Sequence, residues 1–528
     1  MTAMNECKMA RYIFILLLAL YLLSASLRID SGDGETMYRV TYSLVTGQGL
    51  AIPMEPRMTD TFGAWGEVEP VELFEGGDGY GLWGADGRYY AKYGLGWSLA
   101  AAPLCALGRA LASLLPGATE GFLTRAAVML LNPLLTAGAA VLLFYLARRI
   151  YSISLAVTLA LLYGLGTIAW YYAESAFSEP LATLLLLGAI YAVECDHLPA
   201  AGVMLGGMIL TRQMALLLAL PVAAWALIRV WLDRPDRLFR SATVLLIPLA
   251  FGQLATLGYN VYRFGDPLES GYRGVAWNTP LFLGLYSLLL SPGKGLFVFM
   301  PLLLLGVLGW PALRRRDWAW LILGLALFHL VSHALYRDWS GGGGWGPRLL
   351  LPIVPLVLLP AGEIIPRWQA RRIGRIFLVL LVALSLFIQV LGVSVNWVRH
   401  LQRVLDESAT PVEYFYRVHY HWSASPITGQ VRSLTEALTL VRDPASRAAL
   451  AALIGPENGT FIKDWQSKAV GVLSFNVPDF WCVYLWFLGL PVGWLIGVAL
   501  VLFSVAAGTA LQLRRALAGD GLQYGRGG

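Results

Sequence analysis

Long apolar runs alternate with short polar stretches along most of the chain. We count about thirteen apolar segments, at 12–27, 94–112, 126–147, 152–173, 180–194, 198–211, 214–232, 241–262, 296–313, 317–334, 348–364, 376–395 and 480–512. Many of them approach roughly 18 to 22 residues, the length of helix that crosses a hydrocarbon core about 30 Å thick. The pattern therefore predicts an all-α polytopic membrane protein.

Basic residues gather beside these segments and predict their orientation. The clusters are Lys8/Arg11, Arg148/Arg149, Arg234/Arg237/Arg240, Arg314 to Arg316, Arg367/Arg371/Arg372/Arg375 and Arg514/Arg515. Because basic residues favour the cytoplasmic side, both termini are expected inside and the number of crossings must be even. We expect segment 94–112, which glycines and Pro103 interrupt, to be half-inserted or interfacial. About twelve transmembrane helices then remain.

This orientation divides the chain into three predicted parts. Residues 1–395 form a transmembrane module with a first external loop at 28–93, residues 396–478 form an external, small helical region, and residues 479–528 form a last transmembrane helix and a cytoplasmic tail. Few ionisable groups lie within the spans, and many lie in the loops predicted to be external. That distribution favours a reaction site at the outer surface over a conduction path across the bilayer.

Composition supports the membrane assignment and narrows the chemistry. Hydrophobic residues make up 57% of the chain and charged residues only 14%, which excludes an ordinary soluble protein. The net charge of +6 follows from the basic clusters beside the spans, so it does not indicate a nucleic-acid partner. The four cysteines form no CxxC pair, and neither a disulfide nor a zinc site is expected.

Three acids, Asp30, Asp33 and Glu35, follow the first apolar segment within six residues. The stretch after Asp33 predicts a short amphipathic helix in the membrane interface. Its apolar face consists of Met37, Val40, Thr41, Leu44 and Val45. Asp33 could simply cap this helix and interact with its dipole. A cap accounts for only one of the three acids, so a catalytic role for them is the competing interpretation.

Two cations stand where the chain meets the membrane surface. Lys92, in YYAKYGLGW, either extends toward headgroups or holds a lipid phosphate. Segment 198–211 has about fourteen residues, too few to span comfortably, so Arg212 at its end should be partly sunk in the membrane. A cation in that position is costly without a partner, which makes Arg212 a functional candidate.

Several apparent motifs do not predict a site. GYGLWG and GGGGWG match GxGxxG, but neither joins a strand to a helix as a dinucleotide fold requires. SPGKG, which contains Lys294, lacks the spacing of a phosphate-binding P-loop. His329 and His333 share a helix face, but the glutamate of HExxH is missing between them.

Six stretches occur in order between residues 10 and 395: DGETMYRVTYSLVTGQG, AKYGLGWSLAAAPLCALG, FSEPLATLLLL, GGMILTRQMALLLALP, SPGKGLF and WGPRLLLPIVP. Together they resemble GT-C polyprenyl-phosphate-dependent glycosyltransferases, a class that includes protein O-mannosyltransferases and lipid A aminoarabinose transferases. The resemblance implies a GT-C-like helix bundle in the plasma (inner) membrane, with its active site facing the outside or periplasm. It also implies a polyprenyl-phosphate-linked sugar donor and a lipid, glycan or protein acceptor.

The resemblance also implies roles for individual residues. The catalytic base, or a group that assists a divalent cation, maps onto Asp33 or Glu35; Gly34 separates two acids that are often adjacent in relatives. The acid of the second external loop maps onto Glu179, less closely onto Glu174. The remaining candidate substrate-binding residues are Lys92, Tyr93, Arg212, Lys294 and Arg348.

These residues predict an inverting transfer, in which an acceptor attacks the anomeric carbon and a lipid phosphate leaves. No cofactor is certain, and the need for a divalent cation stays open. The alternative is a transporter or a lipid or glycan flippase, which predicts inverted repeats and ionisable groups near the bilayer midplane. The sequence shows neither feature by eye.

Overall fold

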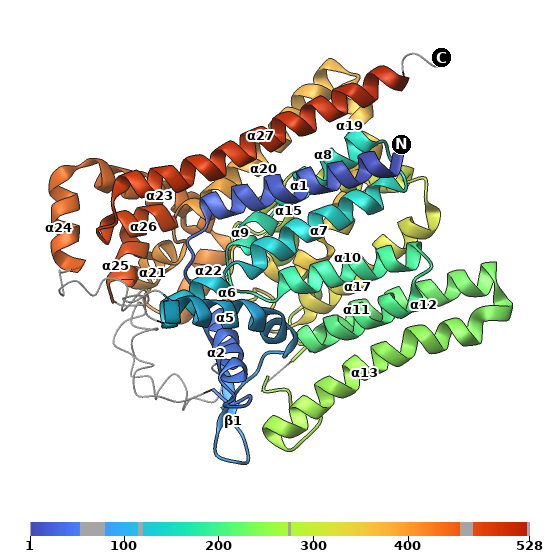
Figure 1. Cartoon of the computed structure of the whole chain (residues 1–528), viewed down its shortest axis with the longest axis horizontal. Helices are drawn as coiled ribbons and strands as arrows, with labels where there is room; N and C mark the ends of the chain where they lie inside the picture. The colour runs from blue at the N-terminus through green and yellow to red at the C-terminus, as the bar shows by residue number, and fades with distance from the viewer. Residues whose placement is uncertain (1, 53–79, 115–119, 273–275, 455–467, 525–528) are drawn as a thin grey trace.

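The structure is a computed structural model that describes residues 2–52, 80–114, 120–272, 276–454 and 468–524. Residues 53–79 of the predicted first external loop lie outside the described residues. The described chain is a bundle of helices, so the all-α fold class is confirmed. The long helices run side by side, and both termini lie at the same end of the bundle (Figure 1).

Eight helices in the described ranges are long and apolar enough to cross a membrane, and nine if one bent pair counts as a single span. They are α1 (Thr2–Ser24), α5 (Gly96–Leu114), α6 (Glu120–Val128) continued by α7 (Leu131–Arg148), α12 (Leu216–Asp233), α13 (Leu238–Phe264), α17 (Arg316–Leu335), α20 (Arg372–Ser394) and α27 (Val492–Tyr524). The bent pair joins η6 (Arg348–Ile353) and α18 (Val354–Leu358) to α19 (Ala361–Gln369) at 58°. The chain is a multi-pass membrane protein.

The predicted number of about twelve spans is not confirmed, because several apolar segments form helices shorter than a full crossing. These are α8 (Ile153–Gly166), α10 (Glu179–Glu194), α11 (Leu198–Thr211) and α16 (Leu303–Gly309), continued by η5 (Trp310–Ala312). The segment predicted to be interfacial forms α5, which is long and apolar enough to cross. Its interfacial placement stays a prediction.

The basic clusters meet at the end of the bundle that carries both termini. There Arg148 lies 2.9 Å from Glu6 of α1, and Arg315 lies 3.1 Å from Glu194 at the end of α10. The grouping agrees with an even number of crossings, and the orientation of this end toward the cytoplasm stays a prediction. We call the opposite end, which carries α2 (Gly32–Val45), the outer end (Figure 1).

Short elements connect the long helices, and many of them lie at the outer end (Figure 1). They are the antiparallel hairpin β1 (Gly81–Trp83) and β2 (Tyr89–Ala91), α9 (Ala169–Ala173), η3 (Gln213–Ala215), α14 (Leu281–Leu289), α15 (Leu296–Phe299), α21 (Val398–Asp406), α22 (Pro411–Tyr420), η7 (Trp422–Ala424), α23 (Pro426–Arg442), α24 (Pro444–Ile454), α25 (Lys468–Asn476) and α26 (Trp481–Phe487). The 3-10 turn η4 (Pro235–Arg237) joins α12 to α13. The described residues within 396–478 form several helices, and the external placement of this region stays a prediction; the hairpin was not predicted.

Candidate active site

Helix α2 begins at the outer end and presents Asp33 from its first turn. Its N-cap is Ser31, whose hydroxyl accepts a hydrogen bond from the Gly34 amide at 3.1 Å. The interpretation of Asp33 as the helix cap is therefore wrong, because Ser31 already satisfies that position. The carboxylate of Asp33 is left to interact with side chains of other elements.

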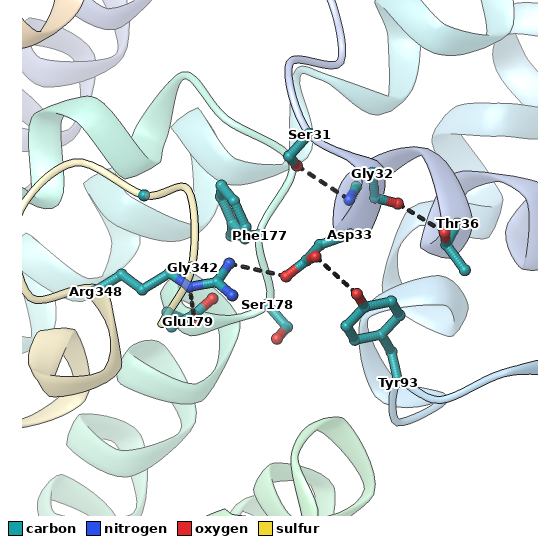
Figure 2. A network of polar contacts seen from close by, with 12 residues as sticks. Ser31, Gly32, Asp33, Thr36, Tyr93, Phe177, Ser178, Glu179, Gly342 and Arg348 are labelled. Carbon is teal, nitrogen blue, oxygen red and sulfur yellow. Dashed lines mark hydrogen bonds and ion pairs between the residues drawn. The ribbon is translucent and has the colours of Figure 1, made fainter. Parts of the chain in front are cut away.

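Two side chains from distant parts of the sequence hold the Asp33 carboxylate. The hydroxyl of Tyr93 donates to Oδ1 at 2.7 Å, and the Arg348 guanidinium lies 2.9 Å from Oδ2. Figure 2 shows Asp33 between these two groups. Burial alone raises the pKa of Asp33, but Arg348, Tyr93 and Lys92 together hold this pKa below its ordinary value. The carboxylate is therefore ionised at neutral pH.

Glu179 lies behind this pair and links Arg348 to Arg212. Its Oε1 is 2.8 Å from Arg212 and 3.8 Å from the Nε of Arg348, and only 1% of its side chain is exposed. Neither carboxylate oxygen of Glu179 accepts a hydrogen bond from the described residues, so we describe both contacts as ion pairs. Arg212 also donates to the Ser178 hydroxyl at 3.0 Å. The partly sunk Arg212 predicted from the sequence thus has a buried acidic partner.

Lys92 lies at the edge of the same group. Its ammonium nitrogen is 5.7 Å from the centre of the Tyr93 ring and 5.2 Å from that of Tyr272. Phe177 supplies a third aromatic face, 4.4 Å from the Arg348 guanidinium carbon. We call Asp33, Tyr93, Lys92, Glu179, Arg212 and Arg348 the outer cluster.

Two close backbone approaches bring the elements of the outer cluster together. A Cβ at Gly34 would lie 2.7 Å from the Ala176 carbonyl oxygen, so glycine lets α2 rest on the loop before Glu179. A Cβ at Gly96 would lie 2.8 Å from the Cα of Thr211, so glycine lets the start of α5 meet the end of α11. The first contact brings Asp33 toward Glu179, and the second brings the Lys92–Tyr93 segment toward Arg212.

Glu35, the other candidate base, has different partners from Asp33. Arg125 binds it through two nitrogens, at 2.6 and 3.1 Å, and Arg39 lies 2.9 Å away. Burial alone raises the pKa of Glu35, but the two arginines hold this pKa below its ordinary value. No contact in the described residues joins Glu35 to Asp33. Its catalytic role stays a prediction, and its geometry is that of a structural ion pair.

The other predicted residues lie apart from Asp33 to different degrees. Glu174, the weaker candidate for the second acid, accepts hydrogen bonds from Ser24 and Trp170. Lys294 is 2% exposed and donates to the carbonyl oxygens of Gly342 and Gly344. It therefore contacts the glycine-rich loop before Arg348.

Sequence reasoning missed Tyr272, Phe177 and Ser178 as members of the site. Ser178 and Phe177 directly precede Glu179 in FSEP, and this adjacency was an available signal. Tyr272 lies in a long connection without periodicity, so no pattern singled it out.

The outer cluster does not have the composition of a metal site. Across the described ranges, no group of three or more His, Cys, Asp or Glu side chains converges as metal ligands would. In addition, Tyr93 and Arg348 occupy the two carboxylate oxygens of Asp33. These residues do not fit a divalent cation, and we derive no step through one.

No protein-family model matches the chain, and no curated protein matches it by sequence. Among solved structures, the crystal structure of ArnT from Cupriavidus metallidurans bound to undecaprenyl phosphate matches at 15% identity and a TM-score of 0.41, covering 94% of this chain and 77% of that one. The apo state of ArnT matches at 13% identity and a TM-score of 0.41, covering 96% and 78%. Similarity at this level transfers neither site residues nor substrates to this chain.

Proposed function

We propose that the chain is an integral membrane glycosyltransferase that moves a sugar from a polyprenyl-phosphate donor to an acceptor, with inversion, at the outer end. The observation that carries this proposal is the Asp33 carboxylate held between Tyr93 and Arg348, with Glu179 and Arg212 directly behind. A carboxylate can accept a proton from an acceptor hydroxyl or amine. The neighbouring cations can bind the phosphate that leaves.

The charge of the outer cluster suits an anionic ligand. Lys92, Arg212 and Arg348 supply three positive charges, and Asp33 and Glu179 supply two negative charges, which leaves one positive charge in excess. Arginine presents a planar fork that can engage two phosphate oxygens at once. The predicted position of the cluster at the membrane surface lets a lipid-linked phosphate reach it while its polyprenyl chain stays in the bilayer.

In the proposed reaction, the acceptor oxygen or nitrogen attacks the anomeric carbon of the donor sugar. The bond between this carbon and the phosphate oxygen breaks, and the phosphate leaves with the electron pair. Asp33 takes the proton from the acceptor. Arg212 and Arg348 stabilise the negative charge that develops on the phosphate.

The ion pair with Arg348 makes Asp33 a weak base while no donor is bound. Its lowered pKa means that the carboxylate holds a proton poorly. A bound phosphate competes for the same guanidinium, and a weaker Arg348–Asp33 pair raises the pKa of Asp33. Donor binding would in this way activate the base.

The direct test measures binding of undecaprenyl phosphate and of the uncharged polyprenol to purified protein in nanodiscs. The parent should prefer the phosphate, and Arg212→Met should weaken phosphate binding by about tenfold to a hundredfold, as expected for a lost charged hydrogen bond. Arg432→Met is the matched control, because Arg432 is a 65% exposed arginine of α23 that pairs with Glu436. A parent that binds both lipids equally would contradict the proposed donor class.

A second measurement separates transfer from transport. Proteoliposomes containing a polyprenyl-phosphate-linked sugar should release polyprenyl phosphate in the presence of an acceptor, because transfer breaks the bond between sugar and phosphate. Movement of the intact sugar lipid across the membrane, with no bond broken, would instead support the flippase alternative.

A further inference from the structure

Lys294 is a buried cation at the outer end that has no acidic partner in the described part of the chain. It lies in the turn Ser291–Gly295 between α14 and α15, and only 2% of the residue is exposed. Burial, and to a smaller extent the neighbouring Arg348, lower the pKa of Lys294 to about 7. Burying an ammonium group is unfavourable unless hydrogen bonds compensate. The partners of this amine therefore indicate what it does.

The amine of Lys294 binds the backbone of the glycine-rich loop at residues 341–346, which we call the glycine collar. It donates to the carbonyl oxygens of Gly342 at 2.9 Å and of Gly344 at 2.6 Å. Gly341 and Gly342 have φ angles of 65° and 64°, a left-handed conformation that favours glycine. On another side, Tyr172 donates to the carbonyl oxygen of Trp345 at 2.9 Å. Two side chains thus anchor the collar.

The glycine collar in turn touches the side chain of Arg348. A Cβ at Gly344 would lie 2.9 Å from Cδ of Arg348, and a Cβ at Gly341 would lie 3.2 Å from its Cγ and Nε. Phe177 covers the guanidinium at 4.4 Å, so the arginine stem and head are both enclosed. The orientation of Arg348 toward Asp33 therefore depends on where the collar lies.

We propose that Lys294 is a positioning residue that fixes Arg348 through the glycine collar. Its amine holds two loop carbonyls in place, the collar limits the rotamers of the arginine stem, and the guanidinium is directed at Asp33. This assignment differs from direct substrate binding by Lys294, the role that the sequence predicted. The consequence for transfer rests on the proposed function, whereas the effect on Arg348 does not.

The turn that carries Lys294 is itself held by the external helical region. The amide of Gly293 donates to the carbonyl oxygen of His419 in α22 at 3.1 Å, and a Cβ at Gly293 would lie 2.4 Å from the Val418 carbonyl oxygen. A series of contacts therefore runs from α22 through the Lys294 turn and the collar to Arg348. Through these contacts, the external helical region helps to hold the outer cluster in place.

The first test reads the position of Arg348 without any substrate. Purified protein in nanodiscs is treated with phenylglyoxal, and mass spectrometry follows modification of Arg348. Lys294→Met keeps an apolar stem but removes both hydrogen bonds, so Arg348 should react about tenfold faster. Tyr172→Phe, which removes the other anchor, should have a smaller effect in the same direction. Lys8→Met, at an exposed lysine of α1, should leave the rate unchanged.

The second test reads binding of farnesyl phosphate in a double-mutant cycle. If Lys294 acts through Arg348, Lys294→Met should weaken binding in the parent but have little further effect in an Arg348→Met background. The proposal would be overturned if Lys294→Met weakened farnesyl phosphate binding by the same factor with and without Arg348→Met. It would also be overturned if a folded Lys294→Met protein showed an unchanged rate of Arg348 modification. If Lys294→Met does not fold, Tyr172→Phe must show both effects. A parent that does not bind farnesyl phosphate contradicts the proposed function, while the modification rate still decides the role of Lys294.

Discussion

At the residue scale, the decisive feature is that Asp33 does not cap α2 and instead forms an ion pair with Arg348. Asp33→Asn keeps the shape of the side chain and an oxygen for the Tyr93 hydroxyl, and Ser31 still caps α2. We expect transfer to fall by about two orders of magnitude or more, as for a lost general base. Thermal stability should fall only moderately, because Arg348 loses one acidic partner but keeps Glu179 at 3.8 Å. Radiolabelled sugar transfer and thermal unfolding in nanodiscs measure the two quantities. Undiminished transfer would remove Asp33 from the mechanism.

The pH dependence of Asp33 follows from the direction of its pKa. Because this pKa is lowered, the carboxylate of the unliganded protein stays ionised as the pH falls from 7 toward its ordinary value of about 3.9. Its ion pair with Arg348 should therefore persist over that range and break only at still lower pH. A bound phosphate should raise this pKa, so binding of farnesyl phosphate should strengthen more in the parent than in Asp33→Asn as the pH falls from 7 to 5. The same pH dependence in both proteins would show that phosphate binding does not raise the pKa of Asp33 into that range, which would contradict activation of the base by the donor.

Glu35 should behave as a structural acid. Glu35→Gln leaves the largely buried Arg125 without its charged partner, and we expect the free energy of unfolding to fall by about 3–5 kcal/mol. The lowered pKa of Glu35 means that its contribution is present above about pH 4.3, the ordinary value, and is lost as the pH falls through the folded-state pKa. Thermal unfolding measures this loss. Full stability combined with lost transfer would instead support Glu35 as the base.

At the element scale, the placement of α2 depends on Gly34. Alanine would improve helix propensity by up to about 1 kcal/mol, but its Cβ would lie 2.6 Å from the Cβ of Ala176. We expect Gly34→Ala to move α2 away from the loop before Glu179 and to lower both stability and transfer. Gly258→Ala in α13 is the matched control, because a Cβ there meets no atom within 4 Å in the described structure. Equal behaviour of the two variants would show that the close approach is not required.

At the scale of the whole molecule, the arginine pattern and the shared end of the two termini predict which side faces out. In a background without the four native cysteines, Arg432→Cys in the external region should react with an impermeant thiol reagent in intact cells. Arg314→Cys should react only after lysis, because it lies beside Arg315 at the end that carries the termini. Both arginine side chains are exposed, at 65% and 78%, so access to the reagent is comparable. Labelling at position 314 in intact cells would reverse the orientation.

The sequence by itself determined the elements whose signal is local. Apolar length predicted the membrane helices, and spacing of three and four residues predicted a helix after Asp33, which the structure confirms as α2. The number of spans was not determined, because short apolar runs such as 198–211 fit either a span or a partial helix. These signals depend on neighbours within a few turns, so they survive without knowledge of the fold.

Only the tertiary structure decided which charged residues meet. Asp33 and Arg348 lie 315 positions apart in the sequence. The spacing of the acids does not distinguish Asp33 from Glu35, whereas in the structure Asp33 pairs with Arg348 and Glu35 pairs with Arg125. Lys294 could be assigned to the glycine collar only once two loop carbonyls were found at its amine. The sequence gives the chemical type of each side chain. Which partner that side chain meets depends on how closely distant backbone segments pack, as they do at Gly34.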